Sequence, residues 1–175
     1  MAEWLLIIGL VGILVYAVVI YNALVRDRQR TKAGWSDIEV QLKRRHDLIP
    51  KLVDAVRHYA AHEQQTLDQV TSLRNQASEL QAATQQGALE TDISRSLLSV
   101  YALQESYPEL KANQNFLQLQ TEISDVENDI QFARRYYNGA VRNLNTRIET
   151  FPDLLIARIF AYQAAQYFEF EAAKI

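Results

Sequence analysis

The stretch VQLKRRHDLIPKLVDAV, residues 40–56, decides how this chain folds. Its apolar residues recur at alternating intervals of three and four, which is the spacing of one face of an α-helix. The same stretch sets three consecutive cations, a histidine and an aspartate just ahead of Pro50. These polar residues suit a catalytic site, a nucleic-acid contact or a structural role, so they also pose the functional question.

The helical spacing extends well beyond this stretch. It runs through Trp35, Ile38, Leu42, Arg45, Ile49, Leu52, Val56, Tyr59, Glu63, Thr66, Val70, Leu73, Ala77 and Leu80. The pattern predicts a first long helix that stops near ATQQGALET, residues 83–91, where Gly87 and small polar residues interrupt it. A short second helix then follows and closes at Tyr107-Pro108.

A second long apolar stripe predicts a third helix from near Leu110. Its members are Phe116, Gln120, Ile123, Glu127, Ile130, Arg134, Tyr137, Val141, Leu144 and Ile148. Pro152 should end this helix and open a fourth as its first residue. The fold class is therefore all-α, an antiparallel bundle of long helices. Because the first helix would be roughly 69 Å long and the second only about 27 Å, the long helices must either break or project from the bundle.

Composition limits the function. The chain has 175 residues, is 49% hydrophobic, and contains five glycines and three prolines, as a mostly helical domain would. A net charge of -3 gives no overall field that attracts nucleic acid. The absence of cysteine excludes disulfides, thiolate metal sites and thiol catalysis.

Residues 4–25 have the composition of a membrane span. From Trp4 to Val25 the only ionisable side chains are tyrosines, and a helix of this length, about 33 Å, would cross the hydrocarbon core of a bilayer. Trp4 and Tyr21 suit the two membrane interfaces. The cations that should meet lipid head groups follow directly, and they are Arg26, Arg28, Arg30 and Lys32.

This charge asymmetry predicts the topology. We expect a single-pass protein of the inner (cytoplasmic) membrane, with the N-terminus outside and the helical domain in the cytoplasm. The expected parts are a short tail at residues 1–3, the transmembrane helix at 4–25, the bundle at 26–170 and a C-terminal tail at 171–175.

Several separated segments resemble the LemA family in order and spacing. They are YNALVRDRQRTKAGWSDIEVQLKRRHDLIPKLVDAVRHYAAHE, ESYPELKANQNFLQLQ, ARRYYNGAVRNLNTRIETFP and YFE, and together they cover most of residues 21–169. The resemblance implies an N-terminal membrane anchor followed by a helical bundle. It implies no established enzymatic activity, while some relatives are tied to membrane organisation, including magnetosome membranes, and others occur beside membrane proteases.

The polar residues around Pro50 favour a structural interpretation. Because proline has no backbone N–H, the carbonyl of His46 should lose its helical partner and the helix should kink. Arg45 lies on the apolar stripe, where a buried guanidinium needs a partner, and Glu127 is the candidate. Arg134 would pair with Glu63 or Asp47. The residues expected to form buried polar structure are Arg45, His46, Asp47, Glu127 and Arg134. Contact with anionic lipid is the alternative role for the three cations.

Two further groups of residues could form a metal site and a docking surface. Asp54, His58 and His62 lie at successive i,i+4 positions, within reach of one metal ion, but the order differs from known metal motifs and a solvated polar face is the simpler interpretation. We therefore assign no catalytic residue, metal ligand or cofactor. The aromatic tail either caps the bundle or forms a docking surface for a partner or the bilayer; its members are Phe160, Tyr162, Tyr167, Phe168 and Phe170.

Together these features predict a membrane-anchored, non-enzymatic helical scaffold that self-assembles and organises membrane or membrane proteins. The alternative is an adaptor for a membrane protease or a similar enzyme. The expected partners are the lipid bilayer and further copies of the chain, or, in the adaptor alternative, another membrane protein. No nucleic-acid partner is expected.

Overall fold

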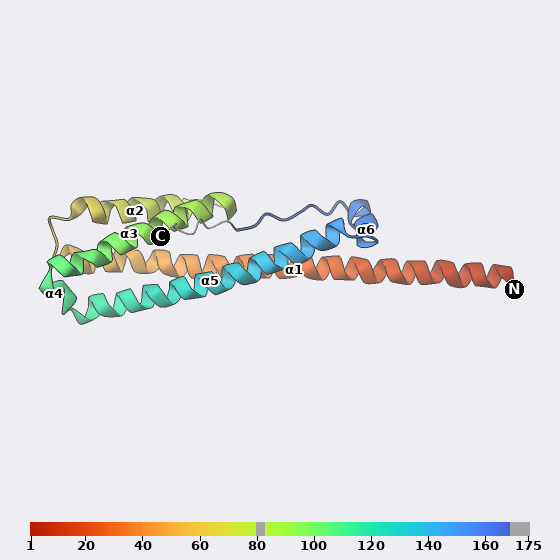
Figure 1. Ribbon diagram of the computed structural model, residues 1–175, viewed down its shortest axis with the longest axis horizontal. Helices are drawn as coiled ribbons and strands as arrows, with labels where there is room; N and C mark the ends of the chain where they lie inside the picture. Colours follow the sequence, from red (N-terminus) through yellow and green to blue (C-terminus); the bar gives the residue numbers. More distant parts are fainter. Residues whose placement is uncertain (80–82, 169–175) are drawn as a thin grey trace.

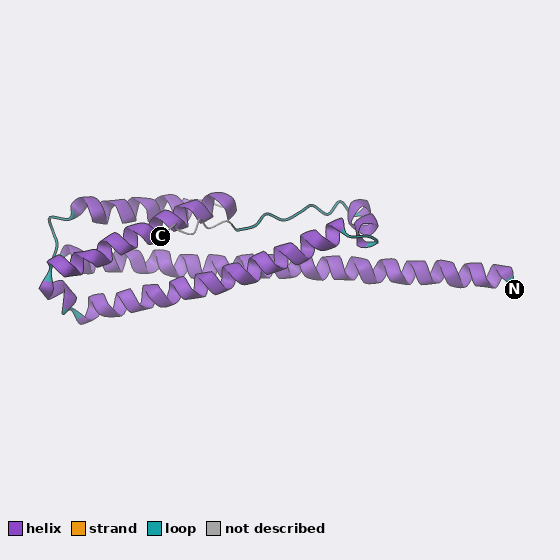
Figure 2. Ribbon diagram, in the orientation of Figure 1, coloured by secondary structure: helices purple, strands orange, loops and turns teal. Residues whose placement is uncertain are grey.

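The computed structural model describes residues 1–79 and 83–168, with the backbone alone at 83–85. The helices are α1 (Ala2–Arg57), α2 (Gln64–Glu79), α3 (Ala83–Ser106), α4 (Pro108–Lys111), α5 (Gln114–Glu149) and α6 (Asp153–Ile159). The described residues contain no strand, so the predicted all-α class is confirmed (Figure 2). Phe170, Leu80 and the expected tail at 171–175 lie outside the described residues.

α1 is one continuous helix of 56 residues, about 84 Å long. Its N-terminal part projects beyond the bundle, and its C-terminal part packs between α5 and the pair formed by α2 and α3 (Figure 1). The apolar segment and the stripe at residues 35–56 therefore belong to the same rod.

The first soluble helix ends much earlier than the sequence predicts. α1 stops at Arg57, the backbone N–H groups of Tyr59 and Ala60 both bond to the carbonyl of Val56, and α2 begins at Gln64. The prediction of one helix reaching residues 83–91 is wrong, and Gly87 lies inside α3. Folding back at this point packs α2 against both α1 and α3, so tertiary packing overrides local helix propensity.

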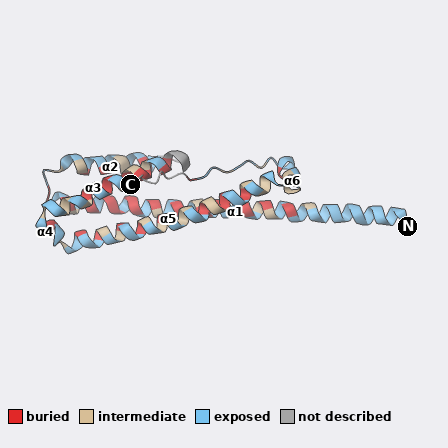
Figure 3. Cartoon of the chain, in the orientation of Figure 1, coloured by how far each residue is buried: buried red, intermediate tan, exposed pale blue. Residues whose placement is uncertain are grey.

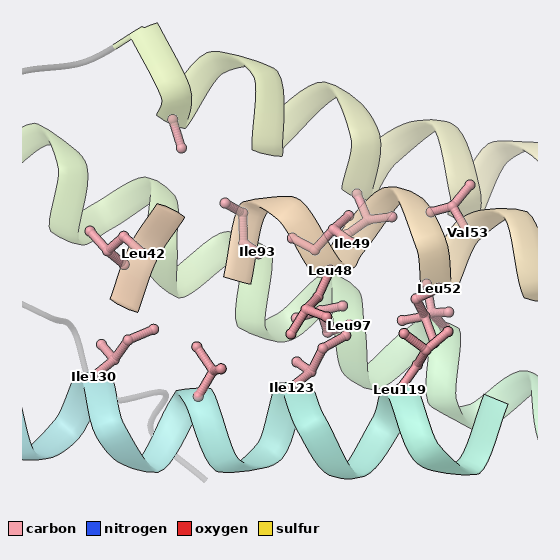
Figure 4. Close-up of a cluster of buried hydrophobic side chains, with 14 of the residues drawn as sticks. Leu42, Leu48, Ile49, Leu52, Val53, Ile93, Leu97, Leu119, Ile123 and Ile130 are labelled. Atoms are coloured by element: carbon pink, nitrogen blue, oxygen red, sulfur yellow. The ribbon is translucent and has the colours of Figure 1, made fainter. Parts of the chain in front are cut away.

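The hydrophobic core lies where α1, α3 and α5 meet. Figure 4 shows Leu42, Leu48 and Leu52 of α1 facing Leu119, Ile123 and Ile130 of α5, with side chains of α3 between them. Burial is concentrated along these contacts, while the projecting part of α1 is exposed (Figure 3). Both predicted stripes supply this core, which confirms their helical spacing.

α1 and α5 approach each other closely at Gly34. A Cβ atom at this position would lie 3.1 Å from the Cα of Tyr137 and 3.0 Å from Cδ1 of Tyr136. These distances are tighter than nine in ten real Cβ contacts, so a side chain at this position would push the neighbouring tyrosine and backbone away.

After α6 the chain returns along α5 without regular structure (Figure 2). The side-chain amide of Asn145 bonds to both the N–H and the carbonyl of Ala165, at 2.8 and 3.0 Å, and Asn138 holds Phe168 in the same way, at 2.9 and 3.1 Å. Seven residues of helix and three residues of extended chain both span about 10 Å, so the two asparagines match this returning segment in register.

Candidate functional site: an exposed apolar segment and two ionic clusters

Among the described residues, α1 is the one helix with a segment long and apolar enough to cross a membrane. Its large side chains from Trp4 to Val19 are exposed; Trp4 is 70% and Leu6 is 74% accessible. An uncovered apolar surface of this extent is far larger than a soluble monomer normally presents. It requires another apolar medium or a partner.

The bundle begins inside the segment predicted to span the membrane. Ile20 and Leu24 are buried against Leu144 of α5 and Ala157 of α6. Tyr21, predicted to lie at the interface, contacts the ring of Phe160 with a centroid distance of 4.6 Å. The chain therefore surrounds the end of its own apolar segment with α5 and α6.

The four predicted head-group cations are exposed just beyond this point; they are Arg26, Arg28, Arg30 and Lys32. The acid between them, Asp27, is buried. It accepts a 2.7 Å hydrogen bond from Nε of Arg147, whose Nη1 donates to Asp153 at 2.7 Å. The hydrogen bond with Asp27 raises the pKa of Arg147.

Asp27, Arg147 and Asp153 form an ionic cluster that ties α1, α5 and the start of α6 together. It was not predicted from the sequence. The available signal was the single acid inside the cationic run RDRQRTK, residues 26–32, next to a membrane segment.

A separate ionic cluster is centred on Arg45. Its guanidinium pairs with the carboxylate of Glu90, and its Nη1 also donates to Ser94 at 3.0 Å and to Glu127 at 3.2 Å. The Arg45 and Glu90 side chains are 1% and 0% exposed, whereas the Glu127 side chain is 39% exposed. The structure thus brings Arg45 and Glu127 together, and it adds Glu90 as the more deeply buried partner.

His46 completes this cluster. Its Nε2 lies 2.8 Å from Oε1 of Glu90. Burial, aided by the positive charges of Arg45 and Arg74, lowers the pKa of His46 to about 4. The imidazole is therefore neutral near pH 7 and donates its Nε2–H to the carboxylate.

The carbonyl freed by Pro50 finds a partner from another helix. α1 continues through Pro50, and Nε of Arg74, on α2, donates to the His46 carbonyl at 3.0 Å. The sequence predicts the free carbonyl but not its partner. The cation that satisfies it comes from the helix packed alongside.

One member of the expected buried polar set differs in the structure. Asp47 is exposed, because it projects opposite the arc that buries Arg45, His46 and Ile49 when each residue turns the helix by about 100°. Glu63, proposed as a partner of Arg134, accepts a 3.2 Å hydrogen bond from Tyr107. Arg134 itself is partly exposed, and burial lowers its pKa.

Glu90 was missed because the boundary between the first two predicted helices was placed at residues 83–91, which left Glu90 at a helix end. Within α3 it lies four residues before Ser94, whose hydroxyl donates to the Glu90 carbonyl at 3.1 Å and to Glu127 at 3.2 Å. In the helix as it forms, Glu90 lies on the same stripe as the buried residues Ile93, Leu97 and Val100. An acid on an apolar stripe indicates a buried ion pair.

The Asp54, His58 and His62 alignment is not formed. α1 ends at Arg57, so the two histidines lie in the turn and do not share a helix face. Across residues 1–79 and 83–168, no group of three or more His, Cys, Asp or Glu side chains is arranged to hold a metal ion. The solvated interpretation of these residues fits their exposure.

The aromatic tail divides into two parts. Phe168 is 2% exposed and lies 6.0 Å from the ring of Trp35, so its assignment to a docking surface is wrong. Its place in the core follows from the asparagine contacts that hold the returning segment on α5. Phe160 and Tyr167 are exposed, and Tyr162 is half-buried beneath the guanidinium of Arg28.

Comparison with known proteins gives one family and several relatives. The family model described as the LemA family matches residues 34–175. The chain is 32% identical to Protein LemA of Metamycoplasma hominis, over 74% of this chain and 60% of that protein. It is 23% identical to Magnetosome protein MamQ 2 of Paramagnetospirillum magneticum, over 85% of this chain and 64% of that protein. It therefore spans less than two thirds of the length of either relative.

Proposed function

The chain belongs to the LemA family, and from this premise we propose that it is a membrane-anchored, non-enzymatic scaffold that self-assembles and organises membrane or membrane proteins. The observation that carries the proposal is α1, which joins the exposed apolar segment to the bundle core without interruption. A rigid connection between a bilayer and a long bundle suits a protein that positions other molecules. The relatives named as magnetosome proteins support the same direction.

The Arg45 cluster supports a structural role for the polar core. A catalytic acid or base must reach its substrate within hydrogen-bond distance, but Arg45 and Glu90 are 1% and 0% exposed. His46 is neutral and uses its Nε2–H on Glu90. The cluster therefore joins α1, α3 and α5, and its central ion pair is closed to solvent.

An exposed apolar surface on α1 and α5 supports self-assembly. Phe132 and Tyr136 lie one helical turn apart on α5 and are 63% and 52% exposed. Val40 of α1 is 59% exposed and shares a helix stripe with Arg44, which pairs with Asp129 of α5 at 3.5 Å. Since Asp129 is one turn before Phe132, the three apolar side chains face the same side of the molecule.

Measuring particle size after extraction in mild detergent tests the proposal. Large uniform particles are expected for a scaffold, and Phe132→Asp should reduce them to a smaller species. Leu98→Asp is the matched control, because Leu98 is an exposed apolar residue, 67% accessible, on α3. A monomer that co-purifies with one partner would instead favour the adaptor, and a monomer without a partner would contradict both.

We further propose the inner-membrane topology with the N-terminus outside. The chain has no cysteine, so Ala2→Cys and Ser99→Cys each create a single thiol. A membrane-impermeant thiol reagent should label residue 2 in intact cells, and residue 99 only after lysis. The reverse result would invert the topology without affecting the scaffold proposal.

A further inference from the structure

α6 exposes an apolar face away from the bundle. Phe151, Leu155 and Ile159 are spaced by four residues and are 74%, 51% and 72% exposed, and Phe160 beside them is 54% exposed. We call these four residues the α6 apolar face. The opposite side of the helix, at Ile156 and Ala157, packs against α1 and α5. Both sides of this seven-residue helix are apolar, and the described residues of this chain cover only one of them.

The contacts of α6 fix its level along α1. Ala157 packs with Ile20 and Leu24, and Phe160 packs on Tyr21. The start of α6 is held through Asp153 and Arg147 to Asp27. Figure 1 shows the helix at the end of the bundle from which the N-terminal part of α1 projects.

This level coincides with the edge of a bilayer that α1 would span. The hydrocarbon core is about 30 Å thick, which corresponds to about 20 helical residues. If Trp4 lies at the far edge, the near edge falls at Leu24, beside α6. A tilt of the helix would move the near edge further along α1, toward Asp27, and α6 would lie still deeper.

We propose that α6 is an interfacial helix, whose apolar face inserts into the lipid–water boundary next to the membrane-spanning part of α1. This inference rests on the proposed membrane anchor. Exposed apolar surface continues from Val18 and Val19 through Tyr21 to Phe160, so the lipid that covers α1 extends directly onto α6. A second copy of the chain would have to share that surface with the bilayer.

The charges around α6 complement a lipid surface. A cavity of about 340 Å³ beside the helix is lined by Arg28, Lys32, Phe160 and Tyr162 among others, and Arg158 of α6 is exposed. Cations placed at head-group level beside aromatic side chains are the arrangement by which interfacial helices bind anionic membranes.

Insertion of α6 would give the protein two contacts with the membrane. A single spanning helix leaves the bundle free to rotate about the helix axis. The second contact, held by the Asp27–Arg147–Asp153 cluster, fixes which side of the bundle faces the lipid. This also fixes the direction in which the Val40, Phe132 and Tyr136 surface points.

Nitroxide labels placed on single cysteines test the inference in the full-length protein. The sites are Leu155→Cys and Ile159→Cys on the α6 apolar face, Leu14→Cys inside the apolar segment, and Leu98→Cys as the aqueous control. The protein is reconstituted into vesicles of phosphatidylethanolamine and phosphatidylglycerol. The measured quantity is the ratio of label accessibility to oxygen, which enters lipid, over accessibility to a water-soluble nickel chelate.

The expected result is a ratio at residues 155 and 159 that approaches the ratio at 14 and clearly exceeds the ratio at 98. Aqueous values at 155 and 159 with a lipid value at 14 would overturn the interfacial helix and leave the anchor intact. Low accessibility to both reagents at 155 and 159 would overturn it in favour of a second copy. An aqueous value at 14 would overturn the anchor and, with it, this inference.

Discussion

Arg45 on α1 and Glu90 on α3 form an ion pair that is almost entirely removed from solvent, at 1% and 0% side-chain exposure. Removing one member leaves the other charged and buried, which costs about 3–5 kcal/mol. We therefore predict that Glu90→Ala lowers the free energy of unfolding by an amount of this order.

Chemical denaturation of the detergent-solubilised protein measures the loss. Glu105→Ala is the control, because Glu105 is an exposed acid on the same helix, and it should change stability by less than about 0.5 kcal/mol. Replacing both partners with apolar residues, as Arg45→Met with Glu90→Leu, should recover much of the loss. Equal effects of Glu90→Ala and Glu105→Ala would show that the pair contributes nothing.

The lowered pKa of His46 predicts how the free energy of unfolding depends on pH. The folded pKa of His46 is about 4, compared with 6.5 for an unperturbed histidine. Between these values the unfolded state binds more protons than the folded state, so the free energy of unfolding falls as the pH falls from 6.5 to 4. The contribution is fully present above pH 6.5, and its loss amounts to at most about 3 kcal/mol.

Urea titrations across this pH range, compared between the parent and His46→Gln, measure the contribution. Glutamine keeps a donor for Glu90 but does not titrate, so the difference in slope isolates the histidine. His62→Gln is the control, since His62 is exposed in the turn, and it should retain the parent slope. Identical pH profiles for the parent and His46→Gln would contradict the assignment.

Pro50 and Arg74 should be energetically coupled. Arg74 Nε bonds to the His46 carbonyl at 3.0 Å, the carbonyl that Pro50 leaves without a helical donor. Arg74→Ala should therefore destabilise the parent protein by about 1–2 kcal/mol. In the Pro50→Ala variant the same mutation should destabilise the protein much less, because the alanine N–H restores the donor for the His46 carbonyl. A double-mutant cycle gives the coupling energy, and strictly additive effects would refute the compensation.

The asparagines of α5 should control the returning segment. Asn138 and Asn145 each make two hydrogen bonds to its backbone, at Phe168 and Ala165. Asn138→Ala with Asn145→Ala should release it, increasing amide hydrogen exchange at Ala165 and Phe168 while α2 and α3 remain protected. Asn143→Ala is a control at an exposed position on α5. Unchanged exchange at Ala165 would contradict this role.

Replacing Ala161 with glycine should stabilise the folded protein. Ala161 adopts φ of 52° at the end of α6, where the N–H of Tyr162 bonds to the Ala157 carbonyl and the N–H of Ala161 to the Arg158 carbonyl. This helix ending normally carries glycine, because a side chain strains the left-handed conformation. Ala161→Gly should stabilise the protein by about 0.5–1 kcal/mol in thermal unfolding. The control Ala102→Gly, at an exposed position inside α3, should destabilise it by a similar amount.

The sequence predicts the helices well where one apolar stripe carries the information. The spacing of apolar residues predicts the stripes of α1 and α5, and composition predicts the apolar segment. Because Arg45 and Glu127 lie on these two stripes, their pairing could also be predicted. Local spacing is sufficient in these regions because each helix buries one continuous face.

The turn after Arg57 was not predictable from local signals. HYAAHE contains neither glycine nor proline, and the turn is held by residues distant in sequence: Asn113 donates to Tyr59 at 2.8 Å, and Tyr107 donates to Glu63. Residues 160–168 likewise contain neither glycine nor proline, yet asparagines of α5 hold their backbone outside a helix. Glu90 depended on the turn as well, because only a correctly placed α3 brings it to Arg45.

The unbroken α1 has a mechanical consequence. No joint separates the part that would lie in lipid from the part that forms the bundle core, so the two tilt as one lever. From Leu24 to Arg57 the lever arm is about 50 Å long, and a tilt of about 20°, ordinary for a spanning helix, carries its far end sideways by roughly 17 Å. Because bilayer thickness affects the tilt of a spanning helix, a thinner or thicker bilayer would thus change the sideways displacement of the far end of the bundle.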